Sequence, residues 1–272
     1  MCAAIRSTYM VTSDGVRLRV LEAGRFDPGR RTVLAFVPGW SMPANIWLPQ
    51  LTTLGATYNV AALDPRGQGE SDIPADGFDI ERRAADLNEF ISRYERVVLV
   101  GWSLGALEAL QFVHRFGAER LDALVLVDSS VGEEPPPPGT GFLDALRHDR
   151  EATLKAFVRN MFQKPRDDAE LAELLKDALR MSLESSLALF PRDIPREHWR
   201  EVARAFGKPL MYVVTRQFAE QAQNLLRHRP RTRIEIFEHA GHALFIDEPD
   251  RFNRLLLEFC EEAAEIHPSG GS

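Results

Sequence analysis

The chain has 272 residues, with 33 lysine and arginine residues against 40 aspartate and glutamate residues, which gives a formal net charge of −7. The composition, 44% hydrophobic and 27% charged, is that of a folded globular protein and excludes a disordered or fibrous chain. The acidic balance argues against a nucleic-acid partner, because binding phosphates requires a clustered basic surface. The length allows one large α/β domain or two small domains.

The two cysteines, Cys2 and Cys260, lie near opposite ends of the sequence. Two thiols cannot form a disulfide framework or a cysteine-based metal site. The first six residues contain neither a basic segment nor a long apolar one, so we expect no signal peptide. No apolar run reaches the roughly 18 residues that a membrane span needs, and we expect a cytoplasmic protein. Pro268–Ser272 is expected to be a flexible tail.

Strand and helix patterns alternate in the first half of the chain. Residues 16–20 alternate apolar and charged side chains, which predicts a half-exposed antiparallel strand. The following strands are short, nearly continuous apolar runs, typical of central strands covered on both faces, at residues 32–37, 58–63, 96–100 and 123–127. Helical patterns lie between them, at about residues 43–55, 81–94 and 104–118. Such units predict a mostly parallel sheet with right-handed connections.

The pattern changes after Asp128. Residues 133–139 include four consecutive prolines and can form neither a helix nor a central strand, so they mark a boundary. Helical periodicity then runs from about residue 142 to 205, with breaks near Pro165, Pro191 and Pro195. Strand patterns resume at residues 209–214 and 233–237, and a last amphipathic helix covers about residues 249–262. We therefore predict an α/β core formed by residues 1–130 and 207–272, with a helical cap inserted at residues 131–206.

The strongest chemical signal is the segment Gly101-Trp102-Ser103-Leu104-Gly105, which lies between a predicted strand and a predicted helix. A serine on so sharp a turn must adopt a strained backbone conformation, and the flanking glycines avoid steric clashes. The N-terminus of the following helix directs its positive end and free N–H groups at the same place. A chance match is the competing interpretation, but the strand–turn–helix context disfavours it. Ser103 is therefore the predicted nucleophile.

A serine hydroxyl needs a base that accepts its proton. Of the seven histidines, only His239 and His242 directly follow a late predicted strand, and Gly241 allows the loop to turn so that His242 reaches the sheet edge. Imidazole accepts and returns protons near neutral pH. We predict that His242 is the base and that the other six histidines are solvated or packed.

Four segments together resemble the α/β-hydrolase superfamily: Val37–Trp40, Leu63–Ser71, Gly101–Gly105 and Ala240–His242. The resemblance covers almost the whole chain and is greatest to small serine carboxylic ester hydrolases of the pimeloyl-carrier-protein methyl ester esterase type. It implies an α/β-hydrolase fold with an inserted cap and a Ser–His–acid triad. It also implies an oxyanion hole formed by the backbone N–H groups of Trp40 and Leu104. In this superfamily the loop at residues 64–69 is mainly structural.

The triad acid is where this sequence departs from the common pattern. Relatives usually carry aspartate in the loop after the strand that here ends at Val214, but residues 215–220 contain none. Some superfamily members place the acid one strand earlier, which is the position of Asp128. A carboxylate there would fix the imidazole tautomer and stabilise the imidazolium. Glu220, or the absence of a functional acid, is the alternative.

The sequence thus predicts a hydrolase that cleaves small-molecule carboxylic esters through an acyl-enzyme, without a metal or another cofactor. A thioesterase, lactonase, C–C bond hydrolase or perhydrolase would use the same triad, and a ligand-binding member with weak activity is a further alternative. Some apolar residues of the cap are expected to line an acyl pocket. The candidates are Phe142, Phe157, Phe162, Leu183, Leu187, Phe190 and Trp199, with Trp40, Met42 and Trp102 narrowing the pocket near the nucleophile.

Overall fold

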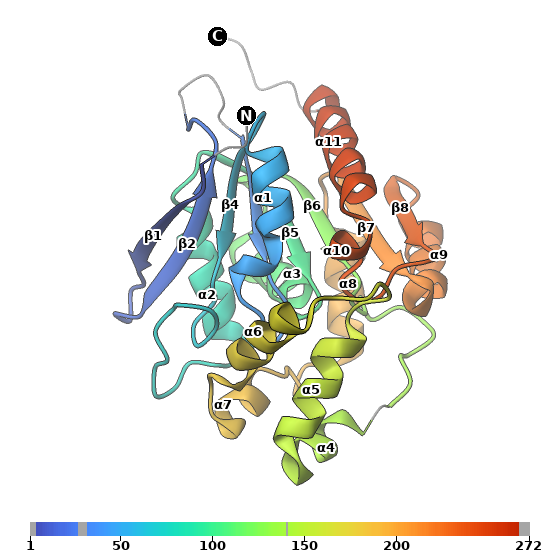
Figure 1. The fold of residues 1–272 in the computed structure, drawn as a ribbon. Helices are drawn as coiled ribbons and strands as arrows, with labels where there is room; N and C mark the ends of the chain where they lie inside the picture. Colours follow the sequence, from blue (N-terminus) through green and yellow to red (C-terminus); the bar gives the residue numbers. More distant parts are fainter. Residues whose placement is uncertain (1–3, 27–31, 140, 267–272) are drawn as a thin grey trace.

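The computed structural model describes residues 4–26, 32–139 and 141–266, so Cys2 and the expected tail, Pro268–Ser272, lie outside the described residues. Within these ranges the chain forms an eight-stranded sheet in the order β1-β2-β4-β3-β5-β6-β7-β8 (Figure 1). Strand β2 runs antiparallel to β1 and β4, and all other neighbours are parallel. The predicted fold class, a mostly parallel sheet with helices on both faces, is confirmed.

The strands lie close to the apolar runs of the sequence. They are β1 (Arg6–Val11), β2 (Arg17–Ala23), β3 (Thr32–Val37), β4 (Asn59–Leu63), β5 (Arg96–Trp102), β6 (Leu121–Val127), β7 (Leu210–Thr215) and β8 (Thr232–Phe237). Strand β1 was not predicted. The predicted half-exposure of β2 is wrong, because every residue of that strand after Arg17 is buried. The charged side chains of β2 are buried with partners: Arg19 pairs with Asp64 at 2.6 Å, and Glu22 accepts a hydrogen bond from the Tyr94 hydroxyl.

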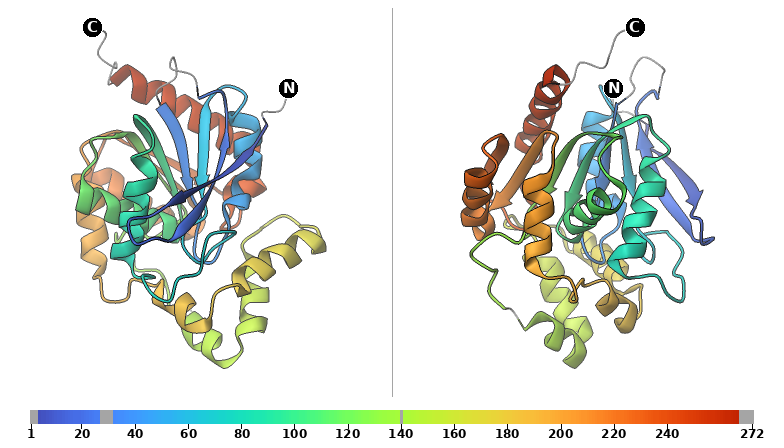
Figure 2. Two further views of the ribbon diagram at one scale, coloured as in Figure 1. Left: turned by 90° about the vertical axis from the view of Figure 1, so that its left-hand side faces the viewer. Right: turned by 180° about the vertical axis from the view of Figure 1, so that it is seen from behind.

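Two helical layers cover the sheet (Figure 2). Helices α1 (Leu48–Leu54) and α11 (Pro249–Ile266) pack together on one face. The other face carries α2 (Ile80–Ile91), α3 (Leu104–Phe116), α8 (Arg196–Ala205) and α9 (Ala219–His228), each in contact with the next. Among the described residues, no helix combines the length and the apolar character that a membrane crossing requires.

Four short helices lie beyond the carboxyl ends of the parallel strands (Figures 1 and 2). They are α4 (Phe142–His148), α5 (Arg150–Asn160), α6 (Asp168–Leu179) and α7 (Leu183–Ala188), and we call them the cap helices. The predicted breaks near Pro165, Pro191 and Pro195 fall between helices. Helix α8 instead packs against α3 and α9 beside the sheet. The division into a core at 1–130 and 207–272 and a cap at 131–206 stays a proposal, in which α8 belongs spatially to the core layer.

Candidate active site

The serine of the Gly-x-Ser-x-Gly segment occupies the turn between β5 and α3. Ser103 has φ +56° and ψ −119°, a strained conformation for a residue with a side chain. The backbone packs too closely around both glycines to leave room for a side chain. A Cβ on Gly105 would lie 2.6 Å from the carbonyl oxygen of Pro38, and one on Gly101 would overlap the backbone of Gly105. A side chain at either position would therefore force the backbone around the turn to shift.

Three of the predicted site residues meet at the carboxyl edge of the sheet. His242, in the loop after β8, has its Nε2 atom 3.0 Å from Ser103 Oγ and its Nδ1 atom 2.8 Å from Asp128 Oδ2. An ionised carboxylate only accepts hydrogen bonds, so Nδ1 carries the proton and the Nε2 lone pair faces the serine hydroxyl. This is the tautomer that can accept a proton from Ser103.

Asp128 follows β6 directly and has φ +42°, a left-handed conformation that turns its side chain at the strand end. The side chain is 1% exposed. Its second oxygen, Oδ1, accepts a hydrogen bond of 2.7 Å from the backbone N–H of Thr215. The last residue of β7, at the position where the following loop carries no aspartate, thus supplies a main-chain donor to the aspartate after the neighbouring strand β6. Nothing in the sequence pattern pointed to this role of Thr215.

The alternative acid lies elsewhere. Glu220 is an exposed residue in the first turn of α9. The structure therefore brings Asp128, and not Glu220, to the imidazole of His242.

The two predicted oxyanion donors lie on segments that adjoin Ser103. Leu104 is the first residue of α3, so its N–H has no acceptor within the helix. Trp40 lies in a turn closed by the Met42 N–H and the Gly39 carbonyl at 3.2 Å. Gly39 is packed so closely that an added Cβ would lie 3.0 Å from Ser103 Cβ.

The side chain of Gln68 braces the turn that carries Trp40. Gln68 is 1% exposed, and its Nε2 donates to the carbonyl oxygens of Gly39 at 3.1 Å and Met42 at 2.8 Å. Its Oε1 accepts from the Ser41 N–H at 3.2 Å. The loop at residues 64–69 was predicted to be mainly structural, and no sequence signal distinguishes Gln68 from the other residues of that loop.

Aromatic residues of the cap surround the Trp40 side chain. The ring centroids of Phe142, Phe157 and Phe190 lie 5.4, 5.5 and 5.2 Å from that of Trp40. Three of the apolar cap residues predicted as pocket candidates thus gather around the segment that holds the candidate oxyanion donor. The arrangement gives this side of the site an apolar character.

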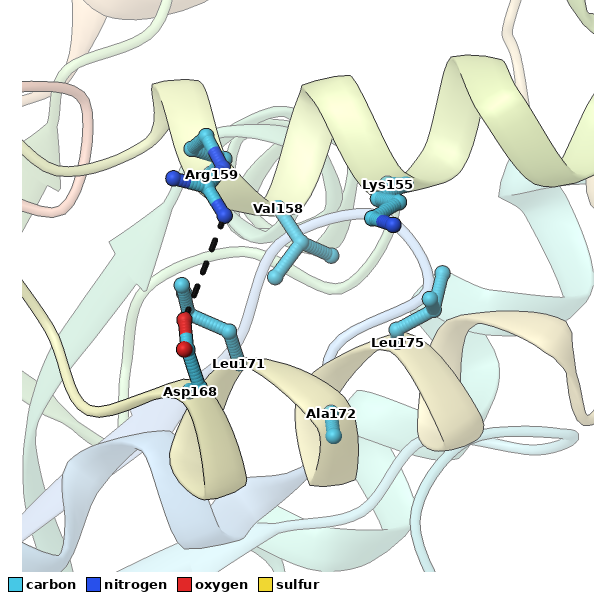
Figure 3. Close-up of a pocket in the computed structure, with 7 residues that line it drawn as sticks. All are labelled: Lys155, Val158, Arg159, Asp168, Leu171, Ala172 and Leu175. Carbon is cyan, nitrogen blue, oxygen red and sulfur yellow. Dashed lines mark ion pairs between the residues drawn. The ribbon is translucent and has the colours of Figure 1, made fainter.

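Two surface clefts lie at this end of the molecule. One, of 540 Å³, has His242 in its wall together with polar residues from the loops after β7 and β8. The other, of 370 Å³, lies between α5 and α6, with Val158 and Leu171 inside it and the ion pair of Arg159 and Asp168 at one end (Figure 3). The second cleft contains no residue of the Ser103–His242–Asp128 group. Among the described residues, no cluster of histidine, cysteine and acidic side chains is arranged to hold a metal.

Comparison with known proteins agrees with this architecture. The model of the family described as "Alpha/beta hydrolase family" matches residues 34–255. The pimeloyl-[acyl-carrier protein] methyl ester esterase of Nitrosomonas europaea is 28% identical, covering 80% of this chain and 92% of its own. A non-heme chloroperoxidase of Kitasatospora aureofaciens is 26% identical, covering 91% and 97%. The crystal structure of a Burkholderia cenocepacia protein provisionally named an aryl esterase superposes with a TM-score of 0.83 at 27% identity, covering 96% of this chain and all of its own.

Proposed function

This chain belongs to the alpha/beta hydrolase family, and from that premise we propose that it cleaves carboxylic esters through an acyl-enzyme formed on Ser103. The observation that carries the proposal is the continuous hydrogen-bonded line from Ser103 Oγ through the His242 imidazole to Asp128, with links of 3.0 and 2.8 Å. Hydrogen bonds arranged in this way activate a serine hydroxyl, which is otherwise a weak nucleophile. The esterase names of two similar proteins support an ester as the substrate class.

In the proposed reaction, Ser103 Oγ attacks the ester carbonyl while His242 Nε2 takes the hydroxyl proton. The oxyanion of the tetrahedral intermediate accepts hydrogen bonds from the N–H groups of Trp40 and Leu104. His242 then donates its proton to the leaving alcohol, and the acyl group stays on Ser103. Water, deprotonated by His242, attacks the acyl-enzyme, and His242 returns the proton to Ser103 Oγ as the acid leaves. Throughout, the Asp128 carboxylate stabilises the imidazolium form of His242.

The name of the chloroperoxidase relative favours a second use of the same intermediate. Hydrogen peroxide can replace water as the nucleophile that attacks the acyl-enzyme, so that a peracid forms and Ser103 regains its proton. Release of a peracid from an ester and hydrogen peroxide, followed through halide oxidation, would identify this activity. Rates of hydrolysis of thioesters and lactones, measured beside those of oxygen esters with the same acyl group, would show which of these substrate classes the protein prefers.

A labelling experiment tests the proposal. The protein is treated with a fluorophosphonate, the modified residue is located by peptide mass spectrometry, and hydrolysis of p-nitrophenyl esters is compared with that of a Ser103→Ala variant. We expect a single adduct on Ser103 and a rate several orders of magnitude above the variant. If Ser103 stays unmodified and both proteins hydrolyse the esters equally slowly, the chain is a ligand-binding member of the fold and the proposed function is wrong.

A further inference from the structure

Three consecutive residues of the loop that carries His242 each form a main-chain hydrogen bond with a residue outside that three-residue segment. The Gly241 N–H donates to Asp247 Oδ2 at 2.7 Å, and the Ala243 N–H donates to the carbonyl oxygen of Met161 at 2.8 Å. Between them, the carbonyl oxygen of His242 accepts from Trp102 Nε1 at 2.9 Å. The backbone on both sides of the imidazole is therefore fixed, and one of its supports, Met161, lies at the end of cap helix α5.

Asp247 joins this loop to the cap through a buried charge. The residue is 1% exposed, and its carboxylate also accepts hydrogen bonds from the backbone N–H groups of Gln163 at 2.8 Å and Lys164 at 3.2 Å. The Lys164 ammonium donates to the main-chain oxygen of Asp247. Hydrogen bonds to an ionised acceptor are stronger than those between neutral groups. A single carboxylate thus ties Gly241 to the segment at residues 161–167, between α5 and α6, which we call the cap linker.

Steric contact reinforces these bonds. A Cβ on Gly241 would lie 2.6 Å from the carbonyl oxygen of Met161 and 2.8 Å from the backbone nitrogen of Gln163. Real Cβ atoms do not approach other heavy atoms this closely, so either the histidine loop or the cap linker would have to move. The two segments are in direct backbone contact and cannot shift independently.

We propose that Asp247 is a positioning residue for His242, and that it makes the cap linker part of the support of the catalytic base. This inference rests on the proposed function, in which the imidazole must stay within hydrogen-bond distance of both Ser103 and Asp128. Displacements of about 1 Å at a reacting group lower rates by as much as 10²-fold. A shift of the cap linker is therefore expected to displace the base as well.

Asp247→Asn is the test variant, because it keeps the shape of the side chain but replaces one accepting oxygen with an NH₂ group that faces backbone N–H donors. The matched control is Asp250→Asn, the same change at an exposed position at the start of α11. We expect Asp247→Asn to lower kcat for a p-nitrophenyl ester at least 10-fold while KM changes less than 3-fold. The control should match the wild type in both parameters.

A spectroscopic measurement separates positioning from simple loss of stability. The proton on His242 Nδ1, assigned by its absence in a His242→Ala variant, should give a downfield ¹H resonance that shifts or broadens in Asp247→Asn at temperatures well below unfolding. Gly241→Ala disturbs the same contact by adding a methyl group and should produce the same shift and the same fall in kcat. Because Asp247→Asn alters hydrogen bonding at constant shape and Gly241→Ala alters packing, either variant can test the inference if the other fails to fold.

One outcome overturns this inference, and a different outcome overturns the proposed function. If both folded variants melt at lower temperature but keep the wild-type kcat and the wild-type Nδ1 resonance, Asp247 is only a structural residue. If the wild type itself fails to react with the fluorophosphonate, the proposed function is wrong, and the resonance still reports whether Asp247 sets the position of the imidazole.

Discussion

The indole N–H of Trp40 donates a hydrogen bond of 2.7 Å to the main-chain carbonyl of Ser186 in cap helix α7. The backbone N–H of the same tryptophan is one of the two oxyanion donors in the proposed mechanism. One residue thus has its main chain beside Ser103 and its side chain inside the cap. Removing the hydrogen bond of the Trp40 indole to Ser186 should therefore weaken the attachment of the cap, while the Trp40 backbone N–H stays in place.

Trp40→Phe tests this relationship. The variant removes the indole donor and leaves the Ser186 carbonyl without it, which should lower the free energy of unfolding by about 1–3 kcal/mol. Trp47→Phe is the matched control, because Trp47 is equally buried but its indole nitrogen has no hydrogen-bond partner in the described part of the chain. Urea denaturation measures the free energy of unfolding of both variants. A loss of stability no greater in Trp40→Phe than in Trp47→Phe would show that the bond to Ser186 contributes nothing.

Gln68→Met should impair catalysis more than binding. The methionine fills a similar volume but cannot hydrogen-bond the Gly39–Met42 turn, so the Trp40 N–H is no longer held in place. Loss of a whole oxyanion donor costs about 10²–10³-fold in kcat, and a displaced donor should cost about 10-fold or more, with KM nearly constant. Steady-state kinetics on one p-nitrophenyl ester provide the measurement.

A buried glutamine elsewhere gives the comparison for this variant. Gln221 is 2% exposed and donates to the Pro135 carbonyl at 2.7 Å, away from the Gly39–Met42 turn. Gln221→Met should lose stability but keep its kcat. Equal kcat values for the two variants would mean that Gln68 supports only the fold.

The extent to which this site could be predicted depends on how local each feature is. Ser103 is marked by a five-residue pattern between a strand and a helix, and the glycines at 101 and 105 are required by contacts close to that turn. His242 is marked by its position directly after the last strand. Both follow from short stretches of sequence, and both were predicted at the positions that the structure brings within 3.0 Å of each other.

Features that depend on distant partners were not predictable in the same way. The bond between Asp247 and Gln163 joins residues 84 positions apart, and neither residue type is unusual in its own segment. The alternation in residues 16–20 indicated a half-exposed strand, but Arg19 is buried because Asp64, 45 positions later, neutralises its charge. A single sequence does not show which residues form such pairs, because the tertiary structure determines the partner of a buried charge.

The choice between the two acids can be tested directly. Asp128→Asn replaces the acceptor of the Nδ1 proton with a group that can also donate, which favours the wrong imidazole tautomer and should lower kcat at least 10²-fold. Glu220→Gln, at an exposed position, should change kcat less than 2-fold. A larger loss in the Glu220 variant would overturn the assignment of Asp128.

A buried ion pair between α2 and α3 predicts how stability depends on pH. Glu108 Oε1 lies 2.5 Å from an Arg83 Nη atom, and both side chains are almost completely buried. Burial raises the pKa of Glu108 to about 7, although the Arg83 charge opposes the shift. In the unfolded chain the carboxyl group ionises near its ordinary pKa of 4.5, so the native state alone keeps the proton between pH 4.5 and 7.

The sign of the effect follows from this difference in bound protons. As pH rises from about 4.5 to about 7, the contribution of Glu108 to the free energy of unfolding should fall, by at most about 1.4 kcal/mol per pH unit. Glu108→Gln cannot titrate, so the wild-type value minus the variant value isolates this group and cancels the others. Urea denaturation at several pH values should give a difference that decreases with pH. A difference that is flat or increases would mean that the Arg83 guanidinium keeps Glu108 ionised in the folded protein.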